Sequence, residues 1–328
     1  AIGIWAATGG AAAAAGPPLG GLLVQADWRL VFLVNVPIGL AGLYHGARRL
    51  SERAEEGAQR PDLPGAAAFA VAIAVLTVAI VKGGDWGWTS GRVLAGFVAA
   101  PLLLAGILWR SGRHPSPIVD PQMLRSRDFL LALLASVTFF TGFGAMLLSG
   151  VLFTTGVWHE SVLTAGLMLA PGPSLAAAFS VPAARIAART GYRTTGLVGS
   201  VLFAGAGLFW MTQTGEHPDY LGSYLPGMFL SGIGVGFMLP TLTGAGAASL
   251  PPARFATGIA VITMGRQVGA SLGVAILVAV LGTGGASADD FRGAWAIVLG
   301  GALASGVLLS LLTPKPRRVP VASATVAA

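Results

Sequence analysis

The stretch GIWAATGGAAAAAGPPLGG, residues 3–21, decides how this chain is interpreted. It is long and apolar enough to cross a bilayer as a helix, because about 20 apolar residues span the hydrocarbon core. Its small residues recur on shared helical faces, so a neighbouring helix can approach closely. Pro17 and Pro18 remove backbone donors and free carbonyl groups inside the helix. The stretch therefore predicts a membrane helix that packs tightly and bends.

The composition excludes a soluble globular protein of this length. Hydrophobic residues make up 54% of the 328 residues, charged residues make up 10%, and the mean hydropathy is +0.76. The chain has no Cys, and its four His residues fall at predicted span ends or in loops, so we expect no metal site and no buried catalytic cluster of an intramembrane enzyme. The net charge of +7 comes from basic residues dispersed among short loops, which favours membrane topology over nucleic-acid binding.

Ten stretches are long and apolar enough to cross the bilayer, and they predict an all-α integral membrane protein. They lie near residues 2–24, 29–47, 64–82, 92–110, 128–156, 162–184, 194–212, 222–246, 256–281 and 292–313. Fifteen of the 20 Lys and Arg residues follow the even-numbered stretches. Because cytoplasmic loops hold the excess of basic residues, we expect a multi-pass protein of the cytoplasmic (plasma) membrane with a cytoplasmic C-terminus.

The opening stretch resembles the antiporter motif of drug:proton antiporters in the major facilitator superfamily, which reads G, eight residues, G, three residues, GP, two residues, GG. The matching positions, predicted to act as a hinge, are Gly3, Ala12, Gly16, Pro17, Gly20 and Gly21. Ala12 stands where Gly is usual and keeps the side chain small. DWRLVFLVNVPIG, residues 27–39, resembles the opening of the sixth helix in the fourteen-span members. General helix packing is the alternative interpretation of the small residues.

The resemblance implies a major facilitator helical bundle with about ten of an expected fourteen helices. Residues 1–50 would be the last two spans of an N-terminal bundle, and residues 51–127 a cytoplasmic linker with two extra central spans. Residues 128–313 would form a C-terminal six-helix bundle, followed by a cytoplasmic tail at 314–328. Residue 1 opens directly into an apolar helix without Met or a basic flank, so we expect a longer protein whose preceding helices are partners of this chain.

Three polar residues within the predicted spans are candidate functional residues: Asn35, Arg266 and Gln267. Residues 264–275, MGRQVGASLGVA, resemble the thirteenth helix of the fourteen-span members, and Gly265, Gly269 and Gly273 fall on one smooth face. A basic residue deep in a span costs about 2.5–3.5 kcal/mol unless it faces a partner or a wet cavity. The alternatives are that Arg266 extends to the lipid headgroups and that Asn35 makes only an interhelical hydrogen bond.

The segment PAARIAARTGYRT, residues 182–194, resembles the cytoplasmic loop motif between paired helices of facilitators. Its matching residues are Arg189, Gly191 and Arg193, while Ala188 occupies the position usually held by Asp. The charge network of that motif would therefore be weaker or would use another acid. The alternative is that these arginines only set the topology.

No Asp or Glu falls well inside a predicted span, because all 13 acids map to loops or span ends. Proton antiport needs a group that changes charge, usually a carboxylate in a cavity. In the resembled family such residues are expected in the first and fourth helices. Candidates for a pocket for lipophilic or cationic substrates are Phe139, Phe140, Met146, Phe153, Phe237 and Met238, with a lipid-facing position or core packing as the alternative for each.

The motifs together favour a secondary active transporter that exports drugs or other lipophilic small molecules in exchange for protons by alternating access. The proton gradient would supply the energy, with no cofactor and no enzymatic activity. An exporter of an endogenous metabolite or natural product would share every motif named above. A truncated chain that does not transport is the third interpretation, since a lone C-terminal portion lacks one of the two bundles.

Overall fold

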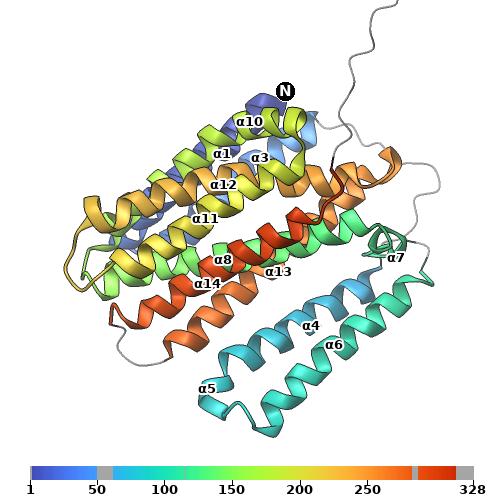
Figure 1. Cartoon of the computed structure of the whole chain (residues 1–328), viewed down its shortest axis with the longest axis horizontal. Helices are drawn as coiled ribbons and strands as arrows, with labels where there is room; N and C mark the ends of the chain where they lie inside the picture. The colour runs from blue at the N-terminus through green and yellow to red at the C-terminus, as the bar shows by residue number, and fades with distance from the viewer. Residues whose placement is uncertain (1, 50–61, 115, 283–286, 315–328) are drawn as a thin grey trace, which may run out of the picture.

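The computed structural model describes residues 2–49, 62–114, 116–282 and 287–314, and within these ranges the regular structure is entirely helical (Figure 1). The long helices are α1 (Ile2–Ala26), α3 (Asn35–Arg49), α4 (Leu63–Val81), α6 (Gly91–Ser111), α8 (Arg127–Gly156), α10 (Pro171–Thr190), α11 (Tyr192–Gln213), α12 (Leu225–Ala248), α13 (Phe255–Leu281) and α14 (Asp290–Ser310). The short elements are α2 (Leu30–Leu33), α5 (Gly83–Trp86), α7 (Pro121–Leu124), α9 (Val162–Leu169), a π-turn at Tyr220–Tyr224 and a 3₁₀ turn at Pro252–Arg254.

Nine helical segments of the described ranges are long and apolar enough to cross a membrane, and they coincide with nine of the ten predicted stretches. The tenth, α1, forms one helix of 25 residues that continues through Pro17 and Pro18. It is not among the nine segments. Nine of the ten predicted spans are therefore confirmed, and the tenth forms a helix at the predicted place.

Two predicted spans are each built from two helical pieces. The stretch 29–47 breaks at Val34, between α2 and α3. The stretch 162–184 divides at Ala170, between α9 and α10, where Pro171 and Pro173 follow at once. Proline has no N–H to donate to the preceding turn, so the helical hydrogen-bond ladder is interrupted at that point. The second piece, α10, then extends six residues beyond the predicted end, to Thr190.

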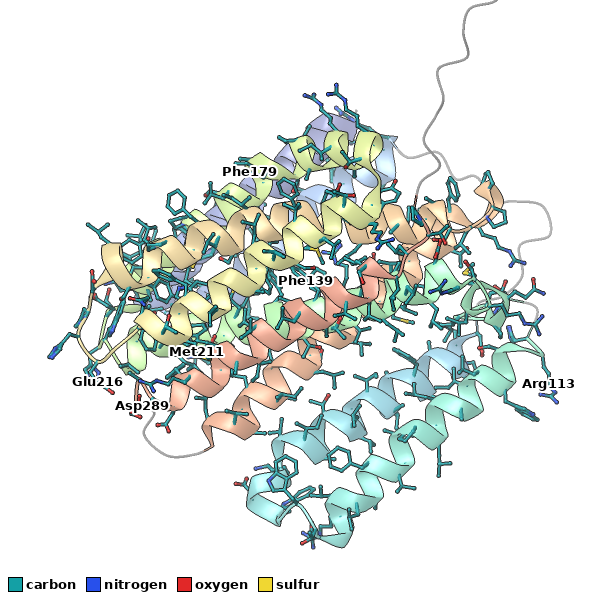
Figure 2. All side chains as sticks on the ribbon, in the orientation of Figure 1. Arg113, Phe139, Phe179, Met211, Glu216 and Asp289 are labelled. Atoms are coloured by element: carbon teal, nitrogen blue, oxygen red, sulfur yellow. The ribbon has the colours of Figure 1, made fainter. Side chains whose placement is uncertain are left out.

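Helices α8, α10, α11, α12, α13 and α14 pack into one bundle (Figure 1). Its centre holds large side chains with almost no exposed surface, among them Phe139, Phe203, Trp210 and Trp295. Figure 2 shows Phe139 of α8 pointing into this interior. The helices approach closely where glycine faces backbone, as at Gly301, where a Cβ atom would lie 2.6 Å from the Thr138 carbonyl oxygen.

Helices α4 and α6 form a hairpin through α5, and α4 lies against α13 of the bundle (Figure 1). The open end of the hairpin is joined by an ion pair between Asp62 and Arg110, with 3.0 Å between a carboxylate oxygen and a guanidinium nitrogen. Asp62 also caps α4 by accepting a hydrogen bond from the Gly65 N–H at 3.0 Å. The hydrogen bond from Arg110 is the main reason why the pKa of Asp62 lies below its usual value.

Candidate functional site

Helix α1 packs along α9 and α10, and at two glycines it meets or offers backbone atoms. A Cβ atom added at Gly21 of α1 would lie 2.8 Å from the Val162 carbonyl oxygen and 3.0 Å from the Cα of Leu163. In the reciprocal direction, a Cβ atom at Gly166 of α9 would collide with the Pro17 carbonyl oxygen. Each helix therefore offers a glycine to the backbone of the other, and neither position has room for a side chain.

Two other glycines of the predicted hinge motif, Gly16 and Gly20, do not take part in this contact. A Cβ atom at Gly16 or Gly20 would have no neighbour within 4 Å. Ala12 is exposed. Gly3 lies in the first turn of α1, and its surroundings are outside what the structure describes. The motif thus has one face that is closed by α9 and another face that is open among the described residues.

Asn35 lies at the break between α2 and α3 and makes a local hydrogen bond. Its Nδ2 donates to the Val31 carbonyl oxygen at 3.0 Å, four residues earlier in the chain. This bond satisfies a backbone acceptor where the helical ladder is interrupted. Among the described residues, Asn35 therefore supports the junction of the two helical pieces and does not bond to another long helix.

The predicted glycine face of α13 is confirmed, because it lies directly against α8. Cβ atoms at Gly269 and Gly273 would collide with the carbonyl oxygens of Val137 and Thr141. A Cβ atom at Gly265 would lie 2.6 Å from Cδ1 of Leu133. The two helices are therefore in close contact along about two turns, and at Gly269 and Gly273 this contact is with backbone.

Arg266 lies next to this glycine face and is half-buried. Its guanidinium carbon lies 4.6 Å from the centre of the Phe140 ring, a distance typical of a cation–π interaction. Its Nε atom is buried without a hydrogen-bond partner. The ion pairs of the described ranges involve Lys82, Arg110, Arg254 and Arg292 instead. Arg266 therefore keeps hydrogen-bonding capacity inside a membrane-spanning helix, while its neighbour Gln267 is exposed.

The predicted loop motif forms a tight turn beside a cavity of about 460 Å³ at one end of the bundle. Gly191 separates α10 from α11 with φ of 91°, a left-handed conformation that favours glycine. Gly191 and Arg193 line the cavity, whereas Arg189 is exposed outside it. The remaining lining residues are Asp128, Thr190, Tyr192, Thr194, Ala245, Ala248, Ser249, Leu312, Thr313 and Pro314.

Asp128 brings an acid to this motif from a distant part of the sequence. It lies in the first turn of α8 and accepts hydrogen bonds from the backbone N–H of Thr313 at 3.3 Å and from its Oγ1 at 3.1 Å. It lines the same cavity as Arg193. Sequence reasoning missed this relation because about 60 residues separate Asp128 from the motif. The only signal available was that another acid should replace the one absent at Ala188.

The six candidate pocket residues lie within the packed bundle. Phe139, Phe140, Met146, Phe153 and Met238 are buried, and Phe237 is partly buried. Phe139 packs against Phe203, with ring centres 4.7 Å apart. None of the six lines the cavity beside Gly191 or the groove between α4 and α6 described below. Their role in substrate binding stays a prediction.

The described acids lie at helix ends or in the connections between helices. Among the described residues, no group of three or more His, Asp or Glu side chains could hold a metal ion. The polar groups inside the spans are thus mainly hydroxyls that bond to their own helix, such as Ser136 to the Ala132 carbonyl oxygen at 2.8 Å. Buried polar atoms without a hydrogen-bond partner in the described ranges are Nε of Arg266, Nε1 of Trp295 and the hydroxyls of Thr77, Ser111 and Ser305, and of these residues only Arg266 is charged.

Comparison with known proteins places the chain in a transport family. The family model described as Major Facilitator Superfamily matches residues 1–274. The chain is 31% identical over 282 residues to the multidrug resistance protein Stp of Mycobacterium tuberculosis, an alignment that covers 86% of this chain and 52% of that protein. It is 31% identical over 286 residues to a methylenomycin A resistance protein of Streptomyces coelicolor, covering 85% of this chain and 58% of the relative.

A third relative is the tetracenomycin C resistance and export protein of Streptomyces glaucescens, which is 30% identical over 279 residues, with 84% of this chain and 52% of that protein covered. The chain thus spans about half the length of these curated relatives. The family match, the all-helical fold and the nine membrane-spanning segments agree with each other. This multi-pass membrane chain belongs to the major facilitator superfamily, a family of transporters and not of enzymes, and is related to drug- and antibiotic-resistance exporters.

Proposed function

We propose that this chain is part of a secondary active transporter that exports lipophilic small molecules in exchange for protons by alternating access. The observation that carries the proposal is the contact between α1 and α9, where Gly21 and Gly166 each face the backbone of the opposite helix. The names of the relatives refer to resistance against several unrelated compounds, and one refers to export. Both points support a drug exporter.

The glycine contact suits a joint that must open and close. Alternating access moves two helical bundles relative to each other around a central site. Interlocked large side chains would have to disengage at every cycle, whereas two backbones that meet through glycines present a smooth surface. We propose that residues 1–50 belong to one bundle and residues 128–313 to the other, so that α1 against α9 and α10 is part of their boundary.

The proton-carrying acid of the proposed exchange would lie elsewhere in the complete transporter. The described acids of this chain lie at helix ends or between helices, where water can reach them from one side of the membrane. A carboxylate that transfers protons across the membrane must reach both sides in turn. We further propose that the protein resides in the cytoplasmic membrane with residues 314–328 in the cytoplasm.

Arg266 is the residue of this chain that we assign to the transport pathway. Its Nε is unpaired and its guanidinium is held on Phe140, so its charge is fixed in position but not neutralised. A guanidinium in this state attracts a carboxylate or the negative edge of a polar substrate group. Export that depends on Arg266 is therefore expected to change with the charge of the transported compound.

The test is export of ethidium from cells that express the complete gene product. We expect export to stop when a protonophore collapses the proton gradient and to resume when an acid-outside gradient is imposed on proteoliposomes. Export that follows ATP or a sodium gradient instead would refute the proposed coupling. The abundance of the transporter in the membrane is measured in parallel, because a loss of export can come from inactive protein or from absent protein.

An exporter of an endogenous natural product is the second candidate function. It is favoured by the relatives named for methylenomycin A and tetracenomycin C, which are single compounds. The two candidates differ in selectivity. Export of several unrelated lipophilic cations at comparable rates supports a drug exporter, whereas export of one compound alone supports the natural-product exporter.

A further inference from the structure

The hairpin of α4 and α6 contains a groove of about 380 Å³ near α5. Its walls are small or branched apolar side chains, chiefly Ala74, Val75 and Val78 of α4 with Ala95 and Ala99 of α6. Ala74, Val78 and Ala95 are exposed, so the groove opens to the surface of the hairpin. In a membrane-spanning hairpin, such a surface is accessible to lipid.

Small residues at the helix crossing explain why the groove exists. A Cβ atom at Gly96 would lie 2.7 Å from the Cβ of Ala79, so the two helices are in close contact where these residues meet. Beside this crossing, Ala95 and Ala99 fill little of the space that opens between the helices. From Arg92 to Ala99 the groove follows seven residues of α6, or about 10 Å. This length corresponds to about a third of the hydrocarbon core.

One end of the groove carries a basic residue without an acidic partner. Arg92 is the second residue of α6, lines the groove and is exposed. Its guanidinium carbon lies 5.8 Å from the ring centre of Trp86, which also lines the groove. Lys82, at the same end of the hairpin, is paired with Asp85 at 2.8 Å, whereas no ion pair of the described residues includes Arg92. The free charge at this mouth is therefore positive.

We propose that this groove is a phospholipid site, in which an acyl chain lies between α4 and α6 and the phosphate binds Arg92. The apolar walls match a hydrocarbon chain, and the guanidinium matches a phosphate oxygen pair. Trp86 is suited to the boundary between hydrocarbon and headgroup because its ring is apolar and its indole N–H is polar. Since the mouth has a net positive charge, the site prefers phosphatidylglycerol over phosphatidylethanolamine. This inference is independent of the transported substrate.

The test is lipid retention by the purified protein, measured by native mass spectrometry after incubation with equal amounts of phosphatidylglycerol and phosphatidylethanolamine. We expect Arg92→Gln to lower the preference for phosphatidylglycerol by about fivefold, the effect of one basic residue at a membrane surface. The matched control is Arg113→Gln. Arg113 lies beyond the opposite end of α6, 4.0 Å from the Trp109 ring centre, where no groove residue is near (Figure 2). This control should keep the preference.

A second pair of variants tests the acyl-chain part of the site. Ala95→Phe fills the groove and should abolish lipid retention, while Val98→Phe, on an exposed position of α6 outside the groove, should leave it unchanged. An unchanged lipid preference in Arg92→Gln, or unchanged retention in Ala95→Phe, overturns the proposal. The proposal is also overturned if tetraphenylphosphonium displaces bound lipid equally well from wild type and from Arg92→Gln. The groove would then be a pocket for lipophilic cations.

Discussion

Replacing Gly21 with alanine puts a methyl group into the contact between α1 and α9. The new carbon would lie 2.8 Å from the Val162 carbonyl oxygen and 3.0 Å from the Leu163 Cα, and both of these are backbone atoms that cannot rotate away. An ordinary contact of about 3.4 Å requires the helices to separate by about 0.6 Å. Overpacking of this kind typically costs about 1–3 kcal/mol.

The neighbouring residue supplies a matched control for this substitution. Gly20→Ala adds the same methyl group to the same helix at a position where it meets nothing within 4 Å. Alanine is also the better helix former by about 0.5–1 kcal/mol, so both variants gain equally in local helix stability. The difference between them therefore reports the contact with α9 alone.

The assay is the initial rate of ethidium export by the complete transporter at equal membrane abundance. A loss of 1–3 kcal/mol in one state of the transport cycle shifts the balance between states by at least about fivefold. We expect Gly21→Ala to slow export by this factor or more and Gly20→Ala to export at the wild-type rate. Equal rates for the two variants would refute the argument that this contact is a working joint of the transporter.

Three further predictions concern other positions. Arg266→Ala should slow export more than Arg266→Lys, because lysine keeps the charge that stacks on Phe140; unchanged kinetics in the alanine variant would mean that Arg266 only reaches the headgroups. Asp62→Asn should lower the melting temperature at neutral pH. The pKa of Asp62 is lowered in the folded state, so its carboxylate stabilises the fold above the usual Asp pKa. This stabilisation is lost as the pH falls through the folded-state pKa. The melting temperatures of wild type and Asp62→Asn should therefore converge in acid. Gly191→Ala should reduce thermal stability by about 1–2 kcal/mol, because alanine is strained at φ of 91°; an unchanged melting temperature contradicts this.

Features set by local sequence could be predicted. Hydropathy located nine spans, since the number of apolar residues needed to cross a bilayer is fixed. The glycines of α13 could be assigned to a shared face because their spacing of four follows the helical period. The helix α1 also forms at its predicted place, although it is not among the nine segments. The division of 162–184 at Ala170 could also have been read from the prolines that follow it.

Features that depend on distant residues could not be predicted. The partner of Pro17 is Gly166, and no pattern within either helix indicates which glycine faces which carbonyl. The approach of Asp128 to the cavity beside Gly191 likewise depends on how the ends of five helices, α8, α10, α11, α12 and α14, meet. The burial of the aromatic pocket candidates was also open, since a Phe in an apolar helix can face lipid, a cavity or the core.

The hydrogen bonds between Asp128 and Thr313 have a consequence for the topology of the bundle. They join the first turn of α8 to the residues just after α14, and α8 and α14 also pack along their lengths. The first and last residues of the bundle are thus adjacent. A short linker could therefore join residue 314 to residue 127, so the bundle is suited to circular permutation, in which new chain ends are opened in one of its exposed connections.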